Sequence, residues 1–61
     1  MLILTKEQRK ALRKLYSRLE SPPSYRQFRR GVLPAFDRSG CVMVRFCSMW
    51  VGVERDGYTH S

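Results

Sequence analysis

The hydrophobic residues of this chain change their spacing once, and this change limits the folds that it can adopt. Between residues 6 and 19 they recur at intervals of three and four, the period of an amphipathic helix. From residue 41 onward they alternate with other side chains, the period of a strand. A Pro-Pro pair and a connecting segment over residues 33–40 separate the patterns. We therefore expect an α+β fold with two N-terminal helices packed on a small antiparallel β-hairpin or sheet.

The first helix is predicted over residues 6–19. Thr5 and Gln8 fit a capping box, in which the threonine hydroxyl accepts from a backbone N–H and the glutamine reaches back. The Pro pair ends this helix because proline cannot continue it. Ser24 can then cap a second, shorter helix over residues 25–30.

Two strands are predicted within residues 41–55, as a hairpin that turns near Cys47 and Ser48. The Asp-Gly pair at 56–57 predicts a further turn, after which residues 58–60 form only a stub of a third strand. The apolar segment Met1–Leu4 could add an edge strand. The sheet is therefore expected to be small and antiparallel.

Residues 1–61 are long enough for one small basic domain with a limited core. With 43% hydrophobic residues the chain is too apolar for disorder despite its charge. The predicted core consists of Leu12, Leu15, Leu19, Phe28, Val32, Val42, Val44, Phe46, Val51 and Val53. Apolar side chains left outside it, such as Met43, Met49 and Trp50, are expected to form a homo-oligomer interface.

Positive charge is concentrated in the helical half. The formal net charge is +7, and residues 1–30 hold nine of the twelve Lys and Arg residues but two of the five acids. Such a one-sided field attracts phosphates or an acidic surface, and arginine pairs with phosphate through two parallel hydrogen bonds. The expected phosphate-binding residues are Arg26, Arg29, Arg30, Arg13 and Lys10. Trp50 and Tyr25 are the candidates for stacking on a base.

Neither catalysis nor metal binding is expected. Cys41, Cys47 and His60 are candidate soft ligands, but the spacing of the cysteines matches no zinc motif and a fourth ligand is missing. Glu54, Asp56 and His60 flank the Asp-Gly turn and could cluster, although a polar hairpin end explains them equally well. We therefore expect buried thiols, no cofactor, no metal and no enzymatic activity.

Two further patterns bear on class and location. Two helices, a tight turn and a hairpin suggest a winged helix-turn-helix, but that fold needs a third helix for which the chain has no room. No apolar run reaches the length of a membrane span, and Met1–Leu4 is not followed by the apolar region of a signal peptide. We therefore expect no membrane partner and a cytoplasmic location.

Two segments, Ser24–Arg30 (SYRQFRR) and Met49–Ser61 (MWVGVERDGYTHS), together with the opening Leu4–Leu12, resemble a family of very short, uncharacterised bacteriophage-encoded proteins. Small phage proteins are often made to modify or block host machinery, so the resemblance favours a binding protein over a metabolic enzyme.

The first hypothesis is therefore a non-catalytic binder of phosphate-bearing ligands, either nucleic acid or a nucleotide. A nucleotide ligand would make the protein a scavenger of a host signal. The alternative is a protein–protein inhibitor that docks on an acidic surface of a host defence or nucleic-acid-handling protein. A third hypothesis is a small virion or assembly component.

Overall fold

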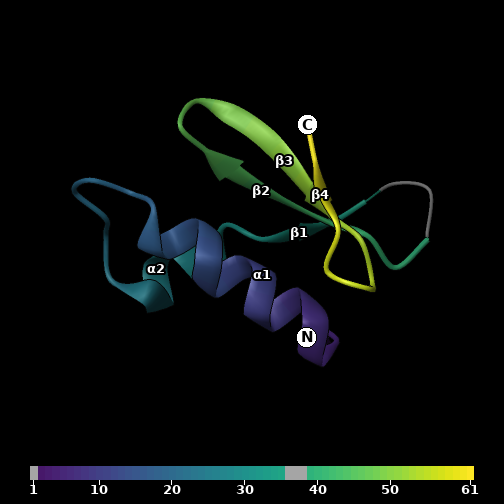
Figure 1. Ribbon diagram of the computed structural model, residues 1–61. Helices are drawn as coiled ribbons and strands as arrows, with labels where there is room; N and C mark the ends of the chain where they lie inside the picture. Colours follow the sequence, from purple (N-terminus) through teal and green to yellow (C-terminus); the bar gives the residue numbers. More distant parts are fainter. Residues whose placement is uncertain (1, 36–38) are drawn as a thin grey trace.

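The computed structural model describes residues 2–35 and 39–61, and within them it contains two helices and one four-stranded antiparallel sheet (Figure 1). The helices are α1 (Lys6–Ser17) and α2 (Tyr25–Arg30). The strands are β1 (Leu33–Pro34), β2 (Val42–Phe46), β3 (Met49–Val53) and β4 (Thr59–His60). Each strand pairs with its neighbour in the sequence. The α+β class predicted from the sequence is confirmed.

The strand register separates the two faces of the sheet. Val44 pairs with Val51, and these side chains are buried. Neighbours at the intervening positions point the other way, because side chains alternate along a strand. We call this second side the outer face. From the register it carries Leu33, Cys41, Met43, Arg45, Trp50, Gly52, Glu54 and His60.

One cluster of buried side chains joins residues of both helices with residues of the two central strands. Its members are Leu4, Ala11, Leu12, Leu15, Phe28, Val32, Val42, Val44, Val51 and Val53. Leu19 and Phe46, which were expected in the core, are only half-buried and pack against its edge. Leu4 and Ala11 were not expected there. Leu4 is buried because it leads the chain into the N-terminus of α1.

The first segment differs from the prediction. Residues 2–4 are not in a strand, and Met1 lies outside the described residues. The edge next to β2 is formed instead by β1, inside the segment expected to be a connection, where Leu33 pairs with Met43. Residues 36–38 of that connection also lie outside the described part of the chain.

Helix α1 ends two residues earlier than expected. The amides of Arg18 and Leu19 donate to carbonyls three residues back, those of Leu15 and Tyr16, so the last turn is tightened and the chain leaves the helix before the Pro pair. In the described residues, neither helix combines the length and the apolar character that crossing a bilayer requires.

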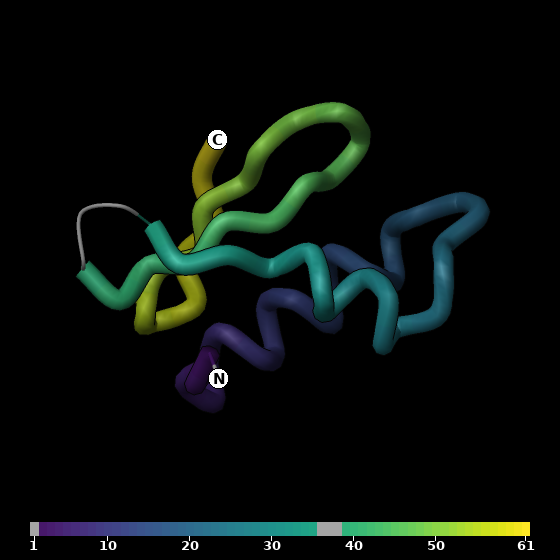
Figure 2. Tube along the Cα trace, turned by 180° about the vertical axis from the view of Figure 1, so that it is seen from behind, coloured from purple at the N-terminus to yellow at the C-terminus, as the bar shows by residue number. Residues whose placement is uncertain are grey.

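The two capping-box residues of α1, Thr5 and Gln8, also hydrogen-bond to the backbone at the end of the sheet. Gln8 is 1% exposed; its amide nitrogen donates to the carbonyl oxygens of Gly40 (2.8 Å) and Val53 (3.1 Å), and its amide oxygen accepts from the Thr5 amide (2.9 Å). The Thr5 hydroxyl donates to the Arg55 carbonyl at 2.6 Å. The ribbon and the Cα tube both show this end of α1 beside the turn that joins β3 to β4 (Figures 1 and 2).

Candidate functional site

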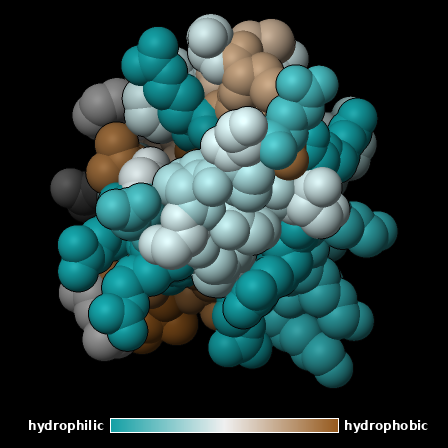
Figure 3. All heavy atoms as spheres, turned by 90° about the vertical axis from the view of Figure 1, so that its left-hand side faces the viewer, coloured by the Kyte–Doolittle hydropathy of each residue, from teal (hydrophilic) through white to brown (hydrophobic). Residues whose placement is uncertain are grey.

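The helical half of the molecule presents a cationic surface that its own acids do not neutralise. We call it the helical basic surface; it consists of Lys6, Arg9, Lys10, Arg13, Lys14, Arg18, Arg26, Arg29 and Arg30. All of these residues except Arg29 are exposed. Within residues 2–35 and 39–61, the only acid–base pair closer than 4.0 Å is Glu54 with His60, in the sheet. Hydrophilic side chains accordingly project on several sides of the end at which the helices connect (Figure 3).

The expected phosphate-binding residues fall into separate groups. Arg13 lies over the ring of Tyr25, with its guanidinium carbon 3.7 Å from the ring centroid, so it links α1 to α2. Arg29 is half-buried and donates to the carbonyl oxygen of Leu2 at 3.2 Å, so it links α2 to the N-terminal segment. Arg26 and Arg30 are exposed and stand four residues apart on α2, so they are neighbours on the helix surface.

Lys10 lines a hollow of about 360 Å³ between α1 and the β3–β4 turn, a hollow that Arg13 does not line. Lys14 and Arg18 line the same hollow, together with Glu7 and Asp56. Lys10, Lys14 and the C-cap residue Arg18 recur every four residues, a spacing visible in the sequence, although only Lys10 was expected to bind phosphate. Three cations against two acids leave the hollow with a net positive charge.

The two stacking candidates occupy different surroundings. Tyr25 belongs to an aromatic cluster with Tyr16 and Phe28, whose ring centroids lie 5.2 Å and 6.1 Å from its own. Because Arg13 covers its ring as well, Tyr25 works mainly as a structural contact between the helices. Trp50 is 46% exposed and lies on the outer face, on the side of the sheet opposite to Val51. The structure therefore does not bring Trp50 together with the arginines of the helices.

The outer face carries an apolar hollow of about 470 Å³. It is lined by residues of the first three strands and the segment after β1: Leu33, Pro34, Ala35, Met43 and Trp50. Leu33 and Trp50 are exposed there. Of the three apolar residues predicted to form an interface, Met43 and Trp50 lie on this outer face, where Met43 is half-buried, whereas Met49 is exposed on the side of the sheet that carries Val51.

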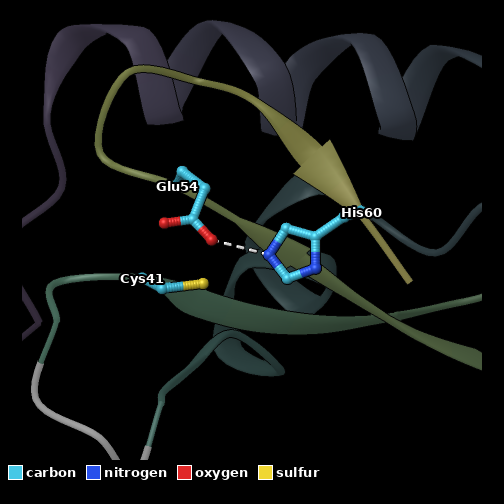
Figure 4. Close-up of side chains that lie close together, drawn as sticks. All are labelled: Cys41, Glu54 and His60. Carbon is cyan, nitrogen blue, oxygen red and sulfur yellow. Dashed lines mark hydrogen bonds and ion pairs between the residues drawn. The ribbon is translucent and has the colours of Figure 1, made fainter.

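A second group of side chains, all of them polar or ionisable, meets on the same outer face. The thiol of Cys41, a carboxylate oxygen of Glu54 and a ring nitrogen of His60 all lie within 4.8 Å of one another (Figure 4). His60 Nε2 is 2.7 Å from Glu54 Oε2. Cys47 is not part of this group, because it is exposed in the turn between β2 and β3.

Sequence reasoning considered Cys41 and His60 as ligands but paired them with the wrong third residue. The register supplies the missing signal. Val42 pairs with Val53, so Cys41 and Glu54 face each other one position farther along, and His60 pairs with Gly52, two positions before Glu54. The predicted hairpin over residues 41–55 already contained Cys41 and Glu54, so working out its register from the turn at Cys47 and Ser48 and adding the third strand would have identified Glu54.

Comparisons with protein families, with curated proteins and with solved structures found no match for this chain. Function is therefore inferred from the residues and their arrangement.

Proposed function

We propose that this chain is a small, non-catalytic accessory protein that binds the phosphate backbone of nucleic acid through the helical basic surface. The observation that carries the proposal is the exposure of eight of that surface's nine cations without an acidic partner within the described residues. Uncompensated Lys and Arg side chains release the counterions of a polyanion when they bind it, which is the main source of non-specific affinity for nucleic acid.

A polymer suits this surface better than a single nucleotide does. A nucleotide site needs a stacking side chain beside its phosphate ligands, but Trp50 lies on the outer face and Arg13 covers Tyr25. The cations are also spread, with Lys10 beside the β3–β4 turn and Arg26 and Arg30 on α2. Spread cations match successive phosphates along a strand, so we propose backbone binding without base readout.

The resemblance to short bacteriophage proteins supplies the biological setting of this proposal. We propose that the protein acts in the cytoplasm of a host cell, that its two helices form a single layer against the sheet, and that it works as a homo-oligomer. In this setting a nucleic-acid binder would regulate or obstruct host nucleic-acid transactions.

The decisive measurement is the salt dependence of binding to fluorescently labelled single-stranded and duplex DNA and to RNA. We expect the logarithm of the binding constant to fall linearly with the logarithm of the salt concentration, with a slope of several units, because each phosphate contact contributes about 0.7 for single strands and about 0.9 for duplexes. Each of the single substitutions Lys10→Gln, Arg26→Gln and Arg30→Gln should reduce the slope by the amount that about one phosphate contact contributes. Arg29 is left intact because it also holds the Leu2 carbonyl.

The matched control is Arg45→Gln, which removes one exposed arginine from the sheet. It should leave the slope unchanged. Equal losses in all four variants would show that only the net charge matters and would contradict a defined helical surface. Tight binding of a mononucleotide with a shallow slope would favour the nucleotide hypothesis. Absence of binding to any nucleic acid at low salt would overturn the proposal and favour the inhibitor of an acidic host protein.

A further inference from the structure

We infer that Cys41, Glu54 and His60 form a binding site for one divalent transition-metal ion, with Zn²⁺ as the best match. The site lies in the sheet and does not depend on the helical basic surface. It offers one sulfur, one oxygen and one nitrogen donor, each from a different strand or strand end. Three protein ligands leave one position of a tetrahedral ion open to water, as in many zinc sites.

The three donors are already gathered to nearly the required spacing. Zinc bonds of about 2.0–2.3 Å to nitrogen, oxygen and sulfur place tetrahedral ligands roughly 3.3–3.8 Å apart. Here the donor atoms lie within 4.8 Å of one another, and the closest pair, Glu54 and His60, is 2.7 Å apart. Small torsions of the Cys41 and Glu54 side chains would complete the site, with the metal replacing the hydrogen bond between Glu54 and His60.

Two features of the fold hold the donors in place. A Cβ atom at Gly52 would lie 2.7 Å from His60 Cε1 and 2.8 Å from its Nε2, so the imidazole rests against the backbone of β3 only because this residue is glycine. Gln8 binds the carbonyl oxygens of Gly40 and Val53, which are the residues immediately before Cys41 and Glu54. The Gln8 side chain therefore holds the backbone next to two of the ligands, Cys41 and Glu54, in place.

The donor set and its exposure indicate the kind of ion. A thiolate and an imidazole favour zinc and its neighbours over Mg²⁺ or Ca²⁺, which prefer oxygen ligands only. The thiolate and the carboxylate bring two negative charges, which a divalent cation neutralises. Cys41 is 6% exposed, whereas the side chains of His60 and Glu54 are 42% and 40% exposed, so an ion can enter from the outer face.

The test is a titration of the untagged, reduced and metal-free protein with Co²⁺, followed by displacement with Zn²⁺. We expect one equivalent to bind, with the thiolate-to-cobalt charge-transfer absorption and the intense visible bands of a tetrahedral ion. Zn²⁺ at about a hundred times its dissociation constant should raise the Tm on the order of 10 °C. The affinity should increase with pH, because the metal displaces protons from its ligands.

The cysteines provide a matched pair of variants. Cys41→Ser should abolish the charge-transfer band, and Cys47→Ser should leave it unchanged. His60→Gln and Glu54→Gln alter exposed side chains and should each weaken binding at least about tenfold, which keeps the test valid if Cys41→Ser does not fold. Gly52→Ala should weaken binding as well, because the added methyl group displaces the His60 ring. A band that depends on Cys47, or no cobalt–thiolate absorption in the wild type, would overturn the inference.

Discussion

Gln8 is the residue on which the attachment of α1 to the sheet depends. The side-chain nitrogen of Gln8 donates to the carbonyl oxygens of Gly40 and Val53, which uses both of its N–H groups. The side-chain oxygen accepts from the backbone N–H of Thr5. Val53 is buried and Thr5 is half-buried, so their backbone groups have little access to water, and a buried polar group costs about 1–3 kcal/mol when it is left unpaired. One side chain thus completes a local cap and a tertiary contact together.

Replacing Gln8 by Glu separates these two tasks. Judged by the helix alone, glutamate suits this position, because it completes a capping box and its charge is favourable near a helix N-terminus. In this fold it would place a carboxylate against two carbonyl oxygens. We therefore expect Gln8→Glu to lower the free energy of unfolding at neutral pH by about 2–3 kcal/mol, measured by urea denaturation.

The second helix contains the matched control. Gln27 occupies the same position after the N-cap of α2. Its backbone N–H donates to the Ser24 hydroxyl, but its side chain is exposed. Gln27→Glu should change the free energy of unfolding by no more than about 0.5 kcal/mol. Similar losses in the two variants would show that the Gln8 contacts with the sheet contribute nothing specific.

Among the elements, the β2–β3 hairpin contains the clearest local strain. Its two-residue loop has positive φ at both positions, 50° at Cys47 and 67° at Ser48, within a region that side chains other than glycine and asparagine rarely adopt. This geometry belongs to the turns that match the twist of paired strands. The sequence around the loop, however, contains no glycine or asparagine. The cross-strand pairs of the hairpin therefore maintain an unfavourable turn.

Ser48→Gly should relieve this strain. We expect the free energy of unfolding to rise by about 1 kcal/mol and the Tm by about 4–8 °C, because glycine adopts positive φ without steric cost. Ser21→Gly is the control, since Ser21 is exposed and has no positive φ; it should be neutral or slightly destabilising. An equal gain from both substitutions would mean that the turn is not strained.

The elements also show how far the sequence could predict this fold. The hairpin and α2 follow from alternation and from a serine cap, signals carried by neighbouring residues. The strand β1 has two residues, one of them proline, and it pairs only because Leu33 lies beside Met43. The grouping of Cys41, Glu54 and His60 likewise depends on the register of three strands. Contacts of this kind arise from tertiary structure, and a local pattern does not contain them.

At the scale of the whole molecule, side chains of both helices and of the central strands form the buried core, and the outer face is the other side of the sheet; in the described part of the chain no helix residue lines its apolar hollow. Most of the cations therefore lie in the helical half, whereas Leu33 and Trp50 lie exposed on the opposite side of the sheet, where Arg45 is the neighbour of Trp50. A chain of 61 residues buries only about 60% of the surface that its unfolded form exposes, so a second copy on the outer face would add needed burial. Such a dimer would leave the helical basic surface of both copies open to a polyanion.

Self-association through the outer face can be tested by sedimentation over a range of protein concentrations. We expect the wild type to form a dimer or higher oligomer, and Trp50→Ser to shift it toward the monomer at least tenfold in dissociation constant, because buried aromatic residues dominate such interfaces. Ile3→Ser is the control, since Ile3 is 87% exposed and does not line the apolar hollow. A wild type that stays monomeric at high concentration, or an equal shift in both variants, would contradict an interface at Trp50.

Dimerisation would also double the cations available to one nucleic-acid strand, so Trp50→Ser should weaken DNA binding while leaving the contacts of each copy unchanged.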